Sequence, residues 1–254
     1  METADLKEFL DEKYFQYNTP DFINSDPIQI PHSFTKREDI EISGFLASTI
    51  AWGNRKMIIN NAKKMIDIMG NTPYDFVMNF DETKANEIPP FVHRTFQQAD
   101  LLYCIASLKN IYENHGGLKT VMENSFKKYG NIKDTLIEFR KIFFECKFPL
   151  RTEKHISNIA KGAAGKRLNM YLMWMCRQDK SGVHFGLWDI PNSALMLPLD
   201  THTASTGRKL ELITRKQNDW KTVEEVTSNL KKLDPNDPVK YDFALFGLGI
   251  FEKF

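Results

Sequence analysis

Residues 162–175 read "GAAGKRLNMYLMWM", and this stretch decides how the chain is interpreted. A turn of four tiny residues precedes Lys166, and the segment that follows is almost wholly apolar as far as Met175. A helix that is apolar on nearly all its faces is a buried helix. We therefore predict that Lys166 opens a buried helix, at the end where the helix dipole is positive and disfavours an ammonium group.

The rest of the chain favours helices over sheet. Its 254 residues suffice for one large domain or two intimate lobes, Phe is frequent at 19 residues, and long β-branched runs are scarce. Helical apolar spacing and stop signals recur throughout, with no internal repeat and no convincing strand pair. The predicted class is all-α, with helices over 35–53, 54–69, 97–113, 118–128, 131–146, 166–176 and 220–233, and further helices starting at 72, 200 and 237.

Capping residues refine several of these helix starts. Thr35 and Glu38 have the spacing of a capping box at the start of the first of these segments. Asp237 precedes Pro238, which is typical of an N-cap followed by the first helical residue. These signals predict where each helix begins.

Composition argues against several classes of protein. The three cysteines are far apart and odd in number, so they predict no disulfide framework, no four-thiolate zinc site and no iron–sulfur cluster. The N-terminal segment is charged and amphipathic, and no stretch approaches the roughly 20 apolar residues of a membrane span. We expect a cytoplasmic protein with no cofactor, no metal and no membrane partner.

Positive charge gathers around the opening stretch although the net charge is only +1. Residues 147–180 contain eight basic and two acidic residues, and residues 207–216 add four basic residues against one acidic residue. A solvated basic face and a phosphate-binding surface both explain this pattern. The neighbouring Gly/Ala turn favours the phosphate-binding surface, because tiny residues let backbone N–H groups approach an anion.

Lys166 has two interpretations, since a nucleotide-binding P-loop is excluded. That motif needs four residues between its glycines and Ser or Thr after its lysine, whereas here two residues intervene and Arg167 follows. Lys166 is then either a lysine that snorkels at a helix end or an amine kept uncharged, and so nucleophilic, by the positive helix end. Asp200, in "LPLDTHTA", is the candidate partner carboxylate or, alternatively, an ordinary N-cap.

These motifs carry a family resemblance. "GAAGKRLNMYL", followed by "PLDTHTASTGRKLEL", resembles the helix–hairpin–helix (HhH-GPD) DNA glycosylase superfamily, nearest its archaeal 8-oxoguanine branch. The order and spacing fit across about residues 38–250, but Lys161 stands where the superfamily hairpin commonly has Pro. The whole sequence is also similar to a bacterial family of uncharacterised proteins of this length, through "WGNRKMI", "KRLNM" and "DPVKYDFALFGLG".

The resemblance implies a specific architecture. Residues 1–254 would form a single HhH-GPD-like unit with a helix–hairpin–helix element at about 153–178 between two helical lobes. One lobe would be a helical bundle over 54–160, and the other would combine 1–53 with 195–254.

The resemblance also implies an activity: removal of a damaged base, such as an oxidised purine, followed by AP-lyase cleavage of the strand. The substrate would be double-stranded DNA with a damaged base or an abasic site. The protein would be a monomer that is associated with the nucleoid when it binds DNA. Lys166 would form the Schiff base and Asp200 would stabilise the transition state. The implied DNA contacts are Lys161, Gly162, Ala164, Gly165, Arg167, Asn54, Arg55, Arg208 and Lys209. The expected base-pocket side chains are Met170, Trp52, Trp174, Trp188 and Phe246. One alternative is a non-catalytic protein that binds DNA or RNA structure and keeps the fold, and another is a helical protein-interaction module.

Overall fold

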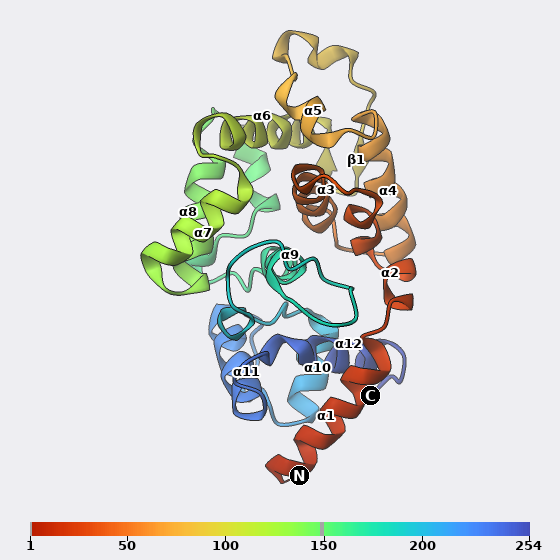
Figure 1. Cartoon of the computed structure of the whole chain (residues 1–254), viewed down its shortest axis with the longest axis vertical. Coiled ribbons are helices and arrows are strands. Elements are labelled where there is room, and N and C mark those ends of the chain that lie inside the picture. The colour runs from red at the N-terminus through yellow and green to blue at the C-terminus, as the bar shows by residue number, and fades with distance from the viewer. Residues whose placement is uncertain (1, 148–149) are drawn as a thin grey trace. The chain divides into compact units, whose positions relative to one another are not determined.

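The computed structural model describes residues 2–147 and 150–254 and is built of helices (Figure 1). Helices make up 65% of it and strands 2%, which confirms the all-α prediction. The contacts divide the chain into two compact units: a terminal unit, formed by the residues up to Asn24 with Asn158–Phe254, and a central unit, Ser25–Ser157. Residues 25–53 fall in the central unit, whereas the sequence interpretation groups them with the C-terminal segment.

The terminal unit is built around α12, which packs against both α1 and α10. Its helices and 3₁₀ turns (η) are α1 (Thr3–Tyr17), α2 (Asp21–Ser25, which ends at the boundary), η5 (Ile159–Lys161), α9 (Lys166–Cys176), η6 (Asn192–Ala194), α10 (Thr201–Lys209), α11 (Trp220–Leu233), η7 (Pro238–Tyr241) and α12 (Asp242–Ile250). Apolar side chains at helical spacing on α10, α11 and α12 meet in one buried cluster that includes Leu199, Ala204, Val226 and Leu245. This cluster is called the terminal core below.

The central unit has an aromatic core, in which the ring of Phe45 contacts those of Phe139 and Phe143 at centroid distances of 5.8 and 5.5 Å. In it α3 packs against α4 and α5, α5 packs against α6, and α7 packs against α8. Its elements are η1 (Pro27–Gln29), η2 (Pro31–Ser33), α3 (Arg37–Thr49), α4 (Arg55–Ile68), α5 (Pro73–Met78), η3 (Glu82–Glu87), β1 (Val92–His93), β2 (Phe96–Gln97), α6 (Gln98–Asn114), α7 (Leu118–Tyr129), α8 (Ile132–Phe143) and η4 (Leu150–His155).

Three local predictions are wrong. Asp237 precedes the 3₁₀ turn η7, but its side chain makes no cap hydrogen bond and pairs with Arg177 instead. The capping box at Thr35 does not form: α3 is preceded by Lys36 with no side-chain cap, and Glu38 pairs with Arg37 at 2.7 Å instead. A short antiparallel pair, β1–β2, exists where none is expected. Arms of two residues are too short to show alternation, and tertiary contacts hold them, including one at 2.9 Å between Asn61 Nδ2 and His93 Nδ1.

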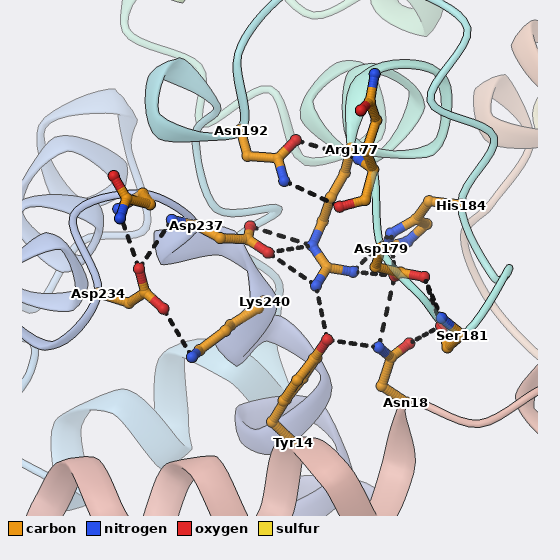
Figure 2. Close-up of polar contacts among 12 residues, drawn as sticks. Tyr14, Asn18, Arg177, Asp179, Ser181, His184, Asn192, Asp234, Asp237 and Lys240 are labelled. Carbon is orange, nitrogen blue, oxygen red and sulfur yellow. Dashed lines mark hydrogen bonds and ion pairs between the residues drawn. The ribbon is translucent and has the colours of Figure 1, made fainter.

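A buried arginine ties α1 to the rest of the terminal unit (Figure 2). Arg177, which is 0% exposed, donates from Nε to both carboxylate oxygens of Asp237 at 3.1 and 3.0 Å. Its Nη1 pairs with Asp179 and lies 3.0 Å from His184 Nδ1, while Nη2 donates to the Tyr14 hydroxyl at 3.0 Å. The guanidinium thus joins three segments that are distant in sequence: α1, the loop after α9 and the start of η7.

Candidate functional site

The segment before Lys166, residues 158–165, forms a tight turn that we call the hairpin. Asn158 Oδ1 accepts a hydrogen bond from Lys161 N at 3.1 Å and caps η5. Gly162 (φ +88°) and Gly165 (φ +66°) then adopt left-handed conformations, which favour glycine. The helix α9 begins directly after Gly165, which confirms that Lys166 opens a helix.

Backbone carbonyls fix the hairpin from inside the terminal unit. Trp220 N, at the start of α11, donates to Gly162 O at 3.0 Å, and Ala163 forms an isolated antiparallel bridge with Asp219. Asn169 Nδ2, on α9, donates to Ala164 O at 3.2 Å. The turn is therefore held by α9 and α11 as well as by its own glycines.

The two hairpin glycines serve different purposes. A Cβ atom at Gly165 would lie 2.5 Å from Ile159 Cδ1, so this glycine is required by internal packing. Gly162 is exposed and has open space where a side chain would be. Of the two, only Gly162 has a surface that a ligand can approach.

This difference predicts unequal costs of substitution. We expect Gly165→Ala to lower the free energy of unfolding by about 2–3 kcal/mol, because a left-handed conformation costs a side chain about 1–2 kcal/mol and contact with Ile159 adds to it. Gly162→Ala should cost only the conformational part. Denaturant unfolding of both variants, repeated in an Ile159→Val background that removes the Cδ1 methyl, measures the difference. Equal costs in both backgrounds would contradict the packing explanation.

Lys166 is half-buried at the mouth of α9. Its ammonium group makes no hydrogen bond or ion pair with the residues that the structure describes. Asp200 is the N-cap of α10: its Oδ1 accepts from Thr203 N at 2.9 Å. Within the described ranges the two side chains form no ion pair with each other.

The hairpin and the start of α10 nevertheless both pack against the terminal core. Ala164, two residues before Lys166, packs against this core, to which Leu199 and Ala204 also belong. These two residues flank Asp200 in sequence. The turn that presents Lys166 and the cap of α10 therefore rest on the same apolar cluster.

The basic residues expected to contact DNA fall into different environments. Arg208 is committed to its own chain: it donates to the carbonyls of Arg215, Lys216 and Gln217 at 2.8–3.3 Å, and so holds the loop that leads into α11. Lys209 Nζ lies 5.7 Å from the centroid of the Phe254 ring. Lys161 is exposed on the hairpin and, among the described residues, has no ion pair, while Arg167 is half-buried.

The basic stretch 147–180 is divided between the two units, and not all of its members are exposed. Arg177 is buried in the cluster of Figure 2, and Arg151 pairs with buried Asp100 at 3.4 Å in the central unit. Lys154 also belongs to the central unit. Of the basic residues in this stretch, the terminal unit presents Lys161, Lys166, Arg167 and Lys180 with at least part of the residue exposed.

The expected pocket residues of the terminal unit divide into core and partly accessible side chains. Trp174 and Trp188 are 2% and 1% exposed, and Trp188 meets Tyr171 edge-to-face at 5.3 Å. They are core side chains, as aromatic residues in helical proteins commonly are. Met170, one turn after Lys166, and Phe246 are half-buried. These last two are the expected pocket residues of this unit that solvent reaches.

Trp52, Asn54 and Arg55 belong to the central unit. The half-buried indole of Trp52 meets the His93 ring edge-to-face at 4.9 Å. Asn54 caps α4 by accepting from Met57 N at 3.2 Å, and Arg55 pairs with Asp26 at 3.6 Å. Each has a contact within its own unit.

The sequence interpretation missed several residues that build this site. Asn158 and Asn169 hold the hairpin, and Arg177 anchors the segment after α9. Asn158 has a sequence signal, because Asn before a short turn is a common cap. Asn169 and Arg177 have none, since their partners are set by tertiary packing.

The structure offers few other sites in the ranges that it describes. Those residues contain no group of three or more His, Cys, Asp or Glu side chains placed to hold a metal ion. No described helix has the length and apolar character needed to cross a bilayer.

Comparison with curated proteins and with solved structures gives no match. A family model for proteins of unknown function (DUF2400) matches residues 26–251, which leaves α1 before the matched segment. The match covers most of the chain. The protein therefore belongs to the DUF2400 family.

Proposed function

We propose that this protein is a base-excision DNA glycosylase with AP-lyase activity, acting on duplex DNA that contains a damaged base or an abasic site. The observation that carries the proposal is Lys166: a half-buried lysine at the first residue of α9, without an ion pair in the described chain, directly after a tight glycine turn. The positive end of a helix disfavours a cation, and the free amine of a lysine is the nucleophile in Schiff-base chemistry.

The chemistry follows from that amine. A damaged nucleotide flipped from the duplex exposes C1′. Lys166 Nζ attacks C1′ and the N-glycosidic bond breaks with its electrons leaving on the base, which takes up the proton that the attacking nitrogen loses. The nitrogen lone pair then breaks the C1′–O4′ bond, O4′ takes a proton from water, and a protonated Schiff base remains at C1′. Removal of a C2′ proton then expels the 3′ phosphate by β-elimination. The exposed Gly162 and Lys161 suit contact with a neighbouring phosphate.

Asp200 has two separable roles under this proposal, capping α10 and stabilising positive charge at C1′. Asp200→Asn preserves an equally good cap, so we expect the free energy of unfolding to change by only a few tenths of a kcal/mol while base release falls at least about 10²-fold. Asp200→Ala should impair base release in the same way and also lower the free energy of unfolding by about 1 kcal/mol, because alanine cannot cap α10. Thermal unfolding and single-turnover base release measure the two effects. If Asp200→Asn releases the base as fast as the wild type, Asp200 serves only to cap α10.

A non-catalytic DNA- or RNA-binding protein is the second candidate. It is favoured by the fact that Asp200 already has a complete structural use as the cap of α10. This candidate predicts salt-dependent nucleic-acid binding without any covalent intermediate.

Borohydride trapping separates the two candidates. Wild-type protein is mixed with a panel of duplexes that carry 8-oxoguanine, other oxidised bases or an abasic site, and borohydride reduces any Schiff base to a stable protein–DNA adduct. Formation of an adduct with at least one duplex supports the glycosylase/lyase. Binding to the panel with no adduct would select the non-catalytic protein.

A further inference from the structure

The helix α4 belongs to the central unit (Figure 1). Its exposed face carries a stripe of basic residues without ion pairs among the described residues. Lys56, Lys63 and Lys64 are exposed, and a helical repeat of 100° per residue places them on one face. None of the three forms a hydrogen bond or ion pair with the residues that the structure describes. Several other basic residues of the unit do have acidic partners, such as Lys109 with Glu113 at 3.8 Å.

Arg94 extends this stripe at the N-terminal end of α4. It is exposed at the tip of the β1–β2 turn, with φ +54°, and has no ion pair within the described ranges. A Cβ atom at Gly53 would lie 2.6 Å from Arg94 Nη1, so the guanidinium rests on bare backbone just before the cap of α4. The contact between Asn61 and His93 holds the β1–β2 turn beside the helix.

We propose that Lys56, Lys63, Lys64 and Arg94 bind the phosphate backbone of duplex DNA. Seven residues of helix separate Lys56 from Lys63 by about 10.5 Å, which matches the rise of about three nucleotides along the DNA axis, at about 3.4 Å for each phosphate of one strand. Neutral Asn60 lies between them on this face, and Asp67 follows one turn after Lys63, where its carboxylate would repel a phosphate and end the stripe.

The stripe lies in the central unit, whereas the hairpin lies in the terminal unit. The inference rests on the proposed function only in naming DNA as the anion that binds. The stripe makes no base-specific contact. Its contribution is affinity that falls with salt, because each neutralised phosphate releases counterions.

The test compares two triple variants of equal charge in a Lys166→Gln background, on an undamaged duplex. One is Lys56→Gln/Lys63→Gln/Lys64→Gln. The control is Lys127→Gln/Lys147→Gln/Lys154→Gln, three lysines of the same unit that are also exposed and without an ion pair in the described chain. Fluorescence anisotropy gives the slope of log Kd against log salt concentration.

We expect the stripe triple to reduce this slope by about 2–3 and the added Arg94→Gln change to reduce it by about 1 more, at about 0.9 per phosphate contact. The control triple should leave it unchanged. Equal reductions in both triples would show a net-charge effect and overturn the stripe, as would no reduction in either. Borohydride trapping by the protein with native Lys166 is a separate readout. A reduced salt slope in the stripe triple without any trapping refutes the proposed enzyme activity alone. Trapping without a reduced salt slope refutes DNA binding by this surface alone.

Discussion

Replacing Lys166 by Gln should abolish borohydride trapping and leave the protein folded. An amide nitrogen cannot form a Schiff base, and loss of the nucleophile from a covalent enzyme costs about 10⁶-fold in kcat. Trapped product should therefore fall below detection on every duplex that the wild type traps. The variant should be as stable as the wild type, because Lys166 makes no hydrogen bond or ion pair with the described residues that the change would remove.

Lys161 supplies the matched control for this change. It lies on the same hairpin, is exposed, and has no ion pair with the described residues. Lys161→Gln removes the same charge and should weaken binding only modestly while trapping persists. If Lys166→Gln still traps DNA as well as Lys161→Gln does, Lys166 is not the nucleophile. If Lys166→Gln loses trapping and thermal stability together, Lys166 has a structural role.

Replacing Arg177 by Met should destabilise the terminal unit by about 3–5 kcal/mol, because its removal leaves the buried carboxylate of Asp179 and the half-buried carboxylate of Asp237 without their counter-charge. The side chain of Asp179 is 3% exposed. Burial acts to raise the pKa of Asp179, but the hydrogen bond from Ser181 and the positive charge of Arg177 outweigh it and hold this pKa below its usual range. Denaturant unfolding with a probe on α1 measures the loss.

The neighbouring Lys180→Met is the control for Arg177→Met. Lys180 is exposed, and the structure gives it no ion pair among the described residues, so its replacement should change the free energy of unfolding by less than about 0.5 kcal/mol. The stabilisation that depends on ionised Asp179 is present above the pKa of the unfolded state and is lost as the pH falls through the lower pKa of the folded state. Similar small losses in both variants would mean that the cluster is not a stabilising anchor.

Most helices could be predicted from local signals. The start of α9 at Lys166 follows from two glycines and an apolar run, and α11 follows from its helical apolar repeat. Such signals are encoded within about one turn of the chain, so a sequence suffices to find them. The β1–β2 pair could not be predicted, because strands of two residues are too short to show an alternation of polar and apolar side chains.

The candidate site was predictable in part. The sequence marks Lys166 and Asp200 as unusual residues at helix starts, and the structure adds that Asp200 caps α10 while Lys166 lacks an ion pair in the described ranges. The roles of the surrounding cations needed coordinates. Arg177 and Arg208 look like members of a basic surface in the sequence, yet one is buried between carboxylates and the other holds a loop.

The sequence by itself thus determined the helical class, the helix that Lys166 opens and the cap at Asp200, because each depends on residues close together in the chain. Tertiary structure alone decided which charges are available to a ligand. Arg177 meets Asp237 sixty residues away, whereas Lys56 and Lys63 meet no described acid although they have the same charge. The free energy of a charge depends on burial and on partners brought together by folding, and neither is encoded in local spacing.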